Sequence, residues 1–125
     1  MSETFRQTRG RQAQVLGVAA ENAACRALEK DGWTIRCRRL RTEAGEIDLV
    51  AEKDGLLAIV EVKARPTLAD AAGALTPRQQ ARLLAAVEIV LAAHPEWSTH
   101  AVRFDVLVVD KSGAVRRICN AFRAE

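Results

Sequence analysis

The sequence predicts an α/β domain of about three layers, with a mixed central sheet of about five strands flanked by helices. Two observations predict this class. Segments with helical periodicity and segments rich in branched apolar residues follow one another in the order helix, three strands, helix, two strands. The length of 125 residues fits one domain over 1–125, and the apolar content of 49% is enough for one core.

The first helix is expected from about Arg11 to Lys30, behind a flexible polar arm at residues 1–9. The segment is rich in alanine and contains no proline, which favours a helix. In a helical projection Glu21 falls inside the apolar sector, next to Leu28, where an acid is unusual. Gly32 predicts the end of the helix, because glycine tolerates the left-handed backbone of a helix cap.

Strands are expected on both sides of a tight turn at Asp54-Gly55, a strong hairpin signal because glycine adopts a positive φ without strain. The two strands of this central hairpin are Glu46 to Lys53 and Leu56 to Ala64. The remaining three strands are expected at Trp33 to Leu40, Ala101 to Val109 and Ala114 to Ala121.

The second helix has a clear start at Thr76. Threonine is a favoured N-cap, Pro77 fits the first helical position, and Gln79 completes a capping box. The apolar stripe continues to about Ala93, and the helix must stop before Pro95. The stretch from residue 67 to residue 75 is expected to be a loop or a short helical piece.

Three charged residues interrupt the apolar strands of the central hairpin. Glu61 and Lys63 are two positions apart, so their side chains leave the same face of one strand. If the register brings Asp48 to that face, two carboxylates and an amine converge. Buried acids are costly unless they are paired, hydrogen-bonded or bound to metal, so the three residues form a candidate metal and phosphate site.

Other interpretations of these residues stay open. Glu61 and Lys63 could form an ion pair at the sheet edge, and Asp48 could share a solvated strand face with Glu46. Lys63 is, however, the one lysine well inside a predicted strand. Asp105 is expected to pair with Arg103.

Histidines give a weaker signal. His94 and His100 flank a loop, and His94 is expected to cap the second helix at its C-terminal end. A catalytic histidine pair is the alternative interpretation.

Composition excludes several classes of protein. Three distant cysteines favour neither a disulfide framework nor a zinc site, and they suit a reducing, cytoplasmic setting. The sequence has no apolar run long enough to span a bilayer and no signal peptide, so no membrane partner is expected. The net charge of +3, carried mostly by arginine, is compatible with a polyanionic partner.

The combination GEIDLV followed by IVEVKAR resembles the YraN family of bacterial endonuclease-like proteins. That family belongs to the PD-(D/E)XK nuclease superfamily and is similar to archaeal Holliday-junction resolvases. The stretches GVAAE, ending at Glu21, and RFDV, containing Asp105, also match the family pattern, so the resemblance covers most of the chain.

The resemblance implies a restriction-endonuclease-like fold and a nuclease that hydrolyses DNA phosphodiester bonds, with branched DNA as a candidate substrate. It implies Mg²⁺ or Mn²⁺ held by Asp48 and Glu61, with Glu21 supporting the metal or its waters. Lys63 would lie near the attacking water and the scissile phosphate. Junction resolution needs two active sites, which makes a homodimer an expected assembly.

Positive residues around the hairpin are available for phosphate contacts. Where the family often has Lys, this chain has Gln79, which removes a charge near the site. The expected nucleic-acid contacts are Arg36, Arg38, Arg39, Arg41, Arg65, Arg78, Gln79 and Arg82. Two alternative functions remain: a non-cleaving nucleic-acid-binding module of the same fold, and a protein-interaction domain in which the charged residues form a structural ion-pair network.

Overall fold

The computed structural model describes residues 17–71, 75–97 and 101–122. Residues 17–30, called here the first helix, are helical. Three strands and a short 3₁₀ helix follow: β1 (Thr34–Thr42), β2 (Gly45–Lys53), β3 (Leu56–Ala64) and η1 (Leu68–Ala71). After them come the helices α2 (Pro77–Ala93) and η2 (Pro95–Trp97), and then the strands β4 (Ala101–Val109) and β5 (Val115–Phe122).

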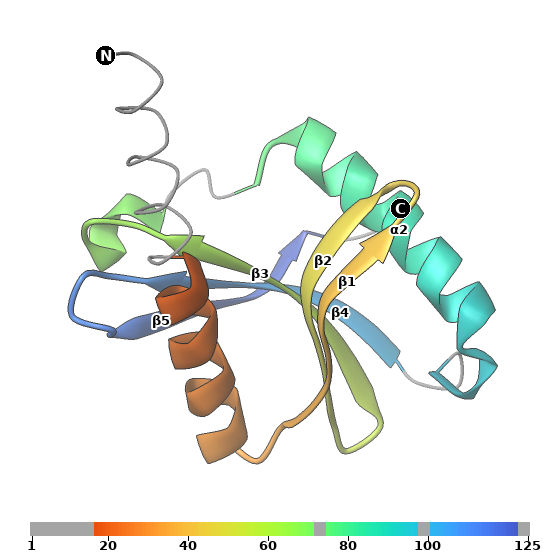
Figure 1. Ribbon diagram of the computed structural model, residues 1–125, viewed down its shortest axis with the longest axis horizontal. Helices are drawn as coiled ribbons and strands as arrows, with labels where there is room; N and C mark the ends of the chain where they lie inside the picture. The colour runs from red at the N-terminus through yellow and green to blue at the C-terminus, as the bar shows by residue number, and fades with distance from the viewer. Residues whose placement is uncertain (1–16, 72–74, 98–100, 123–125) are drawn as a thin grey trace, which may run out of the picture.

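The strands form one sheet in the order β1-β2-β3-β4-β5. Only β3 and β4 are parallel among these neighbours, and the other three pairings are antiparallel. Parallel neighbours need a crossover connection, which α2 supplies between β3 and β4. The predicted mixed five-stranded α/β fold is therefore confirmed (Figure 1).

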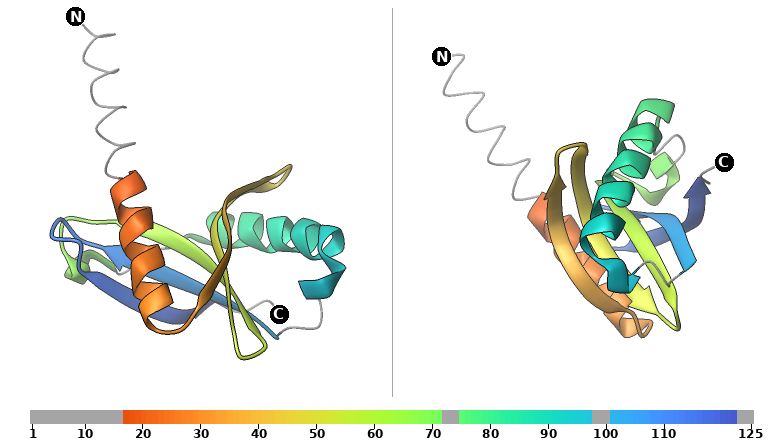
Figure 2. Two further views of the ribbon diagram at one scale, coloured as in Figure 1. Left: turned by 60° about the horizontal axis from the view of Figure 1, so that its bottom comes forward. Right: turned by 90° about the vertical axis from the view of Figure 1, so that its right-hand side faces the viewer.

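Two helices cover opposite faces of the sheet, as the views in Figure 2 show. The first helix packs on Ala58 and Val60 of β3, whereas α2 packs on Leu57 and Ile59 of the same strand. Alternate residues of a strand point to opposite faces, so β3 contributes to both cores and is apolar almost throughout. This explains why its two charged residues stand out in the sequence.

Predicted boundaries agree closely with the structure. The central hairpin and β4 match the expected spans to within one residue, whereas β1 lies at Thr34–Thr42 and extends two residues beyond Leu40. That extension forms because β1 keeps pairing with β2 up to Thr42↔Gly45, at the turn itself. The arm at residues 1–9 and the helix start at Arg11 lie outside the described residues.

Local signals at the helix ends are also confirmed. Thr76 caps α2, and Gln79 completes the capping box with hydrogen bonds in both directions. Gly32 ends the first helix with a φ of 89°, and the Trp33 N–H donates a hydrogen bond to the Leu28 carbonyl. None of the helices in the described ranges is long and apolar enough to cross a membrane.

Candidate metal and phosphate site

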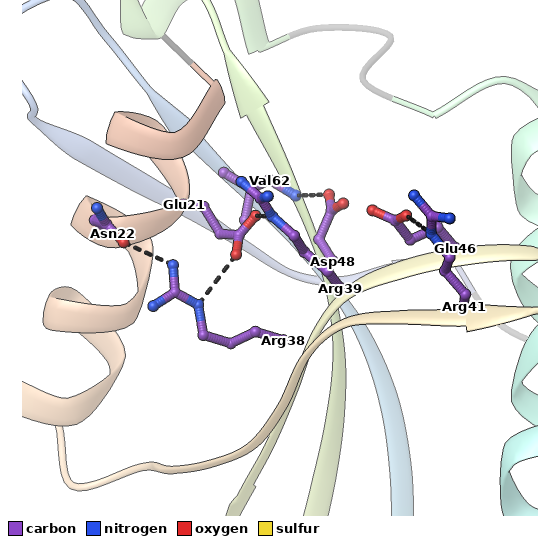
Figure 3. Close-up of polar contacts among 8 residues, drawn as sticks. All are labelled: Glu21, Asn22, Arg38, Arg39, Arg41, Glu46, Asp48 and Val62. Atoms are coloured by element: carbon purple, nitrogen blue, oxygen red, sulfur yellow. Dashed lines mark hydrogen bonds and ion pairs between the residues drawn. The ribbon is translucent and has the colours of Figure 1, made fainter. Parts of the chain in front are cut away.

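The site lies where β2 and β3 separate. Backbone pairing between these strands ends at Leu49↔Val60. One residue further along β2, the Asp48 Oδ2 accepts a hydrogen bond of 2.8 Å from the Val62 N–H (Figure 3). A carboxylate therefore occupies the place where a strand carbonyl would otherwise satisfy this donor, and it stands in the gap between the two strands.

The neighbouring strand β1 has an irregular backbone at Arg39, next to Asp48. The pairing passes from Arg38↔Leu49 to Leu40↔Ile47, so Arg39 lies opposite Asp48. Arg39 has a φ of 51°, in the left-handed region that a non-glycine residue rarely adopts. Successive side chains of a regular strand point to opposite faces, and the turn of the backbone at Arg39 breaks this alternation.

As a result, Glu21 accepts hydrogen bonds from two arginines that are consecutive in the sequence. The Nε atoms of Arg38 and Arg39 each donate to a different Glu21 oxygen, both over 3.0 Å. Arg38 also donates to the Asn22 side chain over 2.6 Å, and Figure 3 shows the three residues together. Glu21 is buried, as the helical projection predicted, but both of its oxygens are already held by arginine.

Glu61 and Lys63 approach the gap from the other side of the sheet. Alternation along β3 assigns both to the face of Leu57 and Ile59, which packs against α2. The Lys63 Nζ lies 4.0 Å from the Glu61 Oε2, and both side chains are largely buried. The Glu61 Oε1 is buried and has no hydrogen-bond partner.

An unpaired buried carboxylate oxygen is costly, and the pKa of Glu61 reflects this cost. Burial and then the nearby Asp48 charge raise the pKa of Glu61 to about 7, while Lys63 and Arg82 act in the opposite direction. Burial also raises the pKa of Asp48, against the hydrogen bond from Val62 and the charge of Lys63. The charge of Asp48 therefore acts on Glu61, whereas the carboxylates that raise the pKa of Asp48 are Glu21 and Glu46.

A cleft opens beside Asp48 on the side of the first helix. It is lined by Glu21, Arg39, Glu46, Asp48, Val62 and Ala64, among others. Within the described ranges, no three His, Cys, Asp or Glu side chains lie together closely enough to hold a metal ion. The structure thus brings Asp48 within electrostatic reach of Glu61 and Lys63, but within the described ranges it does not gather Glu21, Asp48 and Glu61 into one cluster.

Glu46 lines this cleft and was not among the predicted site residues. In the alternative interpretation of the hairpin, Glu46 and Asp48 share a strand face, and this shared face is the signal that could identify Glu46. Hydrogen bonding to Glu21, followed by its charge and those of Glu46 and Asp48, raises the pKa of Arg39. Arg39 is thus the cation that this acidic cleft already contains.

Several of the expected phosphate-binding arginines have protein partners. Arg36 donates to Glu52 over 2.6 Å, and the Arg41 Nε lies 3.5 Å from the Glu46 carboxylate. The stem of Arg82 lies over the first residue of β2, since a Cβ added to Gly45 would come within 2.8 Å of it. Arg65 donates only to the adjacent Ala64 carbonyl among the contacts described, and Gln79 serves the capping box.

Asp105 is a structural acid in this fold. It is fully buried and accepts hydrogen bonds from Arg103 at 2.8 and 2.9 Å, which confirms the predicted pair, and from Arg117 at 3.0 Å. Both guanidinium groups lie over the Trp33 ring, so the cluster joins β4 and β5 to the start of β1.

His94 closes the other end of α2. It is the C-cap residue, as predicted, and its ring stacks on Trp97 with 4.1 Å between the ring centroids. His100, the other residue of the candidate histidine pair, lies outside the described residues.

Comparison with known proteins places the chain among bacterial relatives. A UPF0102 protein of Granulibacter bethesdensis is 63% identical over 117 residues, covering 94% of this chain and 74% of the relative. UPF0102 proteins of Rhodopseudomonas palustris and Azorhizobium caulinodans are 48% and 44% identical, over 86% and 98% of this chain and 83% and 94% of their own lengths. The model of the uncharacterised protein family UPF0102 matches residues 20–109, from the first helix to the end of β4. The resemblance to the YraN family is thereby confirmed, and the chain belongs to the UPF0102 family.

Proposed function

We propose that this protein is a metal-dependent nuclease that cuts DNA phosphodiester bonds. One observation carries the proposal: the half-buried carboxylate of Asp48 and the buried carboxylate of Glu61 lie beside Lys63 at a strand separation, where the charge of Asp48 acts on Glu61. Such a group of charges destabilises the fold unless a cation or another ligand compensates it, and perturbed carboxylates of this kind concentrate at functional sites.

The donor set suits Mg²⁺ or Mn²⁺. Both ions prefer carboxylate oxygens, and Mg²⁺ is commonly held by one or two carboxylates while it keeps several water molecules. Asp48 and Glu61 would supply two such groups, and the unpartnered Glu61 Oε1 is an oxygen in need of a positive partner. Glu21 would contribute through a water molecule or after Arg39 is released.

Each residue would have a distinct role in hydrolysis. When bound, the ion would polarise the phosphoryl oxygen and lower the pKa of a coordinated water. Lys63 would place its ammonium group against the negative charge that grows on the phosphate as the bond to the leaving oxygen breaks. Asp48 would stay oriented through its bond to the Val62 N–H, so the strand backbone itself positions the ligand.

A cleavage assay tests this function. Single-stranded, duplex, flap and four-way-junction DNA, together with RNA, should be incubated with Mg²⁺ or Mn²⁺ and with the wild type or the variants Asp48→Asn, Glu61→Gln and Lys63→Met. We expect cutting to require the metal and to fall by at least about a hundredfold in each variant, while DNA binding is mostly retained.

Glu29→Gln is the matched control, because Glu29 is an exposed acid of the first helix. It should cut like the wild type. Cleavage that survives in purified Asp48→Asn or Glu61→Gln would refute the assignment. A preference for the four-way junction would in turn support a homodimer that presents two sites, which sedimentation of the complex would check.

The second candidate is a nucleic-acid-binding module of the same fold that does not cleave. It is favoured by the ion pairs that already hold Glu21, because a site with that acid neutralised by arginine lacks part of the expected ligand set. Salt-sensitive DNA binding by the wild type without cutting on any substrate, with either metal, would favour this module over the nuclease.

A further inference from the structure

We infer that Arg39 is an internal counter-ion which occupies the acidic cleft and must leave it before a divalent cation can bind. The inference rests on the proposed nuclease function, because it concerns access of metal to the same site. It adds a positioning residue that the family resemblance does not supply: an arginine that exchanges between Glu21 and the DNA backbone.

The first support is charge. The cleft contains the carboxylates of Glu21, Glu46 and Asp48, and Arg39 lines it together with them. In Figure 3 the Arg39 side chain runs from β1 past Asp48 to Glu21. A divalent cation placed beside Asp48 would repel this guanidinium, so the two cations compete for the same acidic groups.

The second support is the backbone. Arg39 is one of two non-glycine residues with positive φ among the described residues, and the other, Asp54, lies in a hairpin turn. A left-handed residue within a strand is strained, and such strain persists only where other interactions hold it. The bond from Arg39 to Glu21 is the interaction that the left-handed backbone makes possible, so the two features belong together.

The third support is accessibility. The Arg39 side chain is 51% exposed, whereas Glu21 is only 8% exposed. Arg39 can therefore turn to solvent, or to a phosphate, without opening the core. Arg38 would remain to hold Glu21 and Asn22, since it is bonded to both. Release of Arg39 would supply a cation at the place where substrate phosphate arrives.

Binding of Mn²⁺, measured by electron paramagnetic resonance of the free ion, tests the inference without any cleavage. Arg39→Gly removes the cation and suits the left-handed backbone, and Arg39→Asn does the same with a residue that also tolerates this region. We expect both variants to bind Mn²⁺ about tenfold more tightly than the wild type. Arg39→Lys keeps the charge and should stay within about threefold of the wild type.

Arg26→Ala is the matched control, because Arg26 is an exposed arginine of the first helix that does not line the cleft. It should change the affinity by less than about threefold. A second readout is the Arg39 Nε–H resonance, which should shift towards that of a solvated arginine when Mg²⁺ is added, while the Arg38 resonance keeps its position.

The outcomes separate the two hypotheses. If the wild type binds Mn²⁺ and the folded Arg39→Gly and Arg39→Asn variants bind it no more tightly, the counter-ion role is wrong and the nuclease proposal stands. If none of the proteins binds Mn²⁺, both are wrong. Tighter binding in both neutral variants, with Arg39→Lys near the wild type, supports the exchange.

Discussion

At the scale of single residues, the charged groups of this protein divide into those that are satisfied and those that are not. Asp105 is as deeply buried as any core residue, yet two arginines neutralise it. Glu61 is also buried, but one of its oxygens has no hydrogen-bond partner and its neighbour Asp48 carries the same charge. The first arrangement compensates the buried charge within the protein, whereas the second is the costly arrangement on which the proposed metal site rests.

The raised pKa of Glu61 predicts how stability depends on pH. Its pKa is about 7 in the folded state, against an ordinary value of 4.5, so between these values the folded protein holds the proton more tightly than the unfolded chain does. The contribution of Glu61 to stability is therefore fully present below pH 4.5 and is lost as the pH rises through 7. Glu61→Gln removes this dependence.

We expect Glu61→Gln, in the presence of a chelator, to be more stable than the wild type by roughly 2 kcal/mol at pH 8 and by much less at pH 5. Urea unfolding at the two pH values measures the difference. Added Mg²⁺ should stabilise the wild type at pH 8 and leave Glu61→Gln almost unchanged. Glu29→Gln, on the exposed face of the first helix, should keep the pH profile of the wild type. Equal destabilisation of Glu61→Gln at both pH values would contradict this prediction.

At the scale of elements, Gln79 has a structural role at the start of α2. The Gln79 Oε1 accepts from the Thr76 N–H over 2.9 Å, and the Gln79 N–H donates to the Thr76 hydroxyl over 3.2 Å. Glutamine and glutamate can complete this reciprocal cap, but lysine has no acceptor. Gln79 therefore completes a cap that lysine could not complete.

Gln79→Lys should lower the free energy of unfolding by about 1 kcal/mol, because it removes one capping bond and puts a positive charge at the positive end of the helix dipole. Gln79→Glu is the matched control, since it keeps the acceptor and adds a favourable charge, and it should be at least as stable as the wild type. Urea unfolding of the three proteins measures both changes. A Gln79→Lys protein as stable as Gln79→Glu would show that the cap does not matter for the fold.

Most of this architecture could be predicted from the sequence, because elements depend on local patterns. Asp54-Gly55, Thr76 and Gly32 each mark a boundary through backbone conformation or capping, which a few neighbouring residues determine. The irregularity at Arg39 could not be predicted, because a strained backbone is held by distant contacts. The inward direction of Glu21 was readable from helical spacing, but its capture by two consecutive arginines depends on that irregularity.

At the scale of the whole molecule, many of the arginines form ion pairs with acids of the same chain. Arg103 and Arg117 neutralise Asp105, Arg38 and Arg39 hold Glu21, and Arg36 is paired with Glu52. For the proposed nuclease, the arginines without a carboxylate partner among the described residues are available to DNA in addition to Arg39. Arg65, just beyond Lys63 on the chain, and Arg78, in the first turn of α2, are two of them.

The dependence of DNA affinity on salt concentration measures how many phosphates such a surface contacts. Each phosphate that a cation neutralises releases counter-ions, so the logarithm of the binding constant falls linearly with the logarithm of the salt concentration. We expect Arg65→Ala and Arg78→Ala each to reduce the magnitude of this slope by about 1. Arg36→Ala should change it much less, because the Arg36 guanidinium already donates to Glu52 over 2.9 and 2.6 Å.

Fluorescence anisotropy with labelled duplex DNA, titrated at several salt concentrations with Ca²⁺ in place of Mg²⁺, measures the slopes without cleavage. The arginines act additively if they touch separate phosphates, so the Arg65→Ala, Arg78→Ala double variant should lose about 2 units of slope. Equal slopes in all variants would mean that DNA contacts another surface. Absence of binding at low salt would favour the protein-interaction domain, because an electrostatic interface of this kind binds most tightly when counter-ions are scarce.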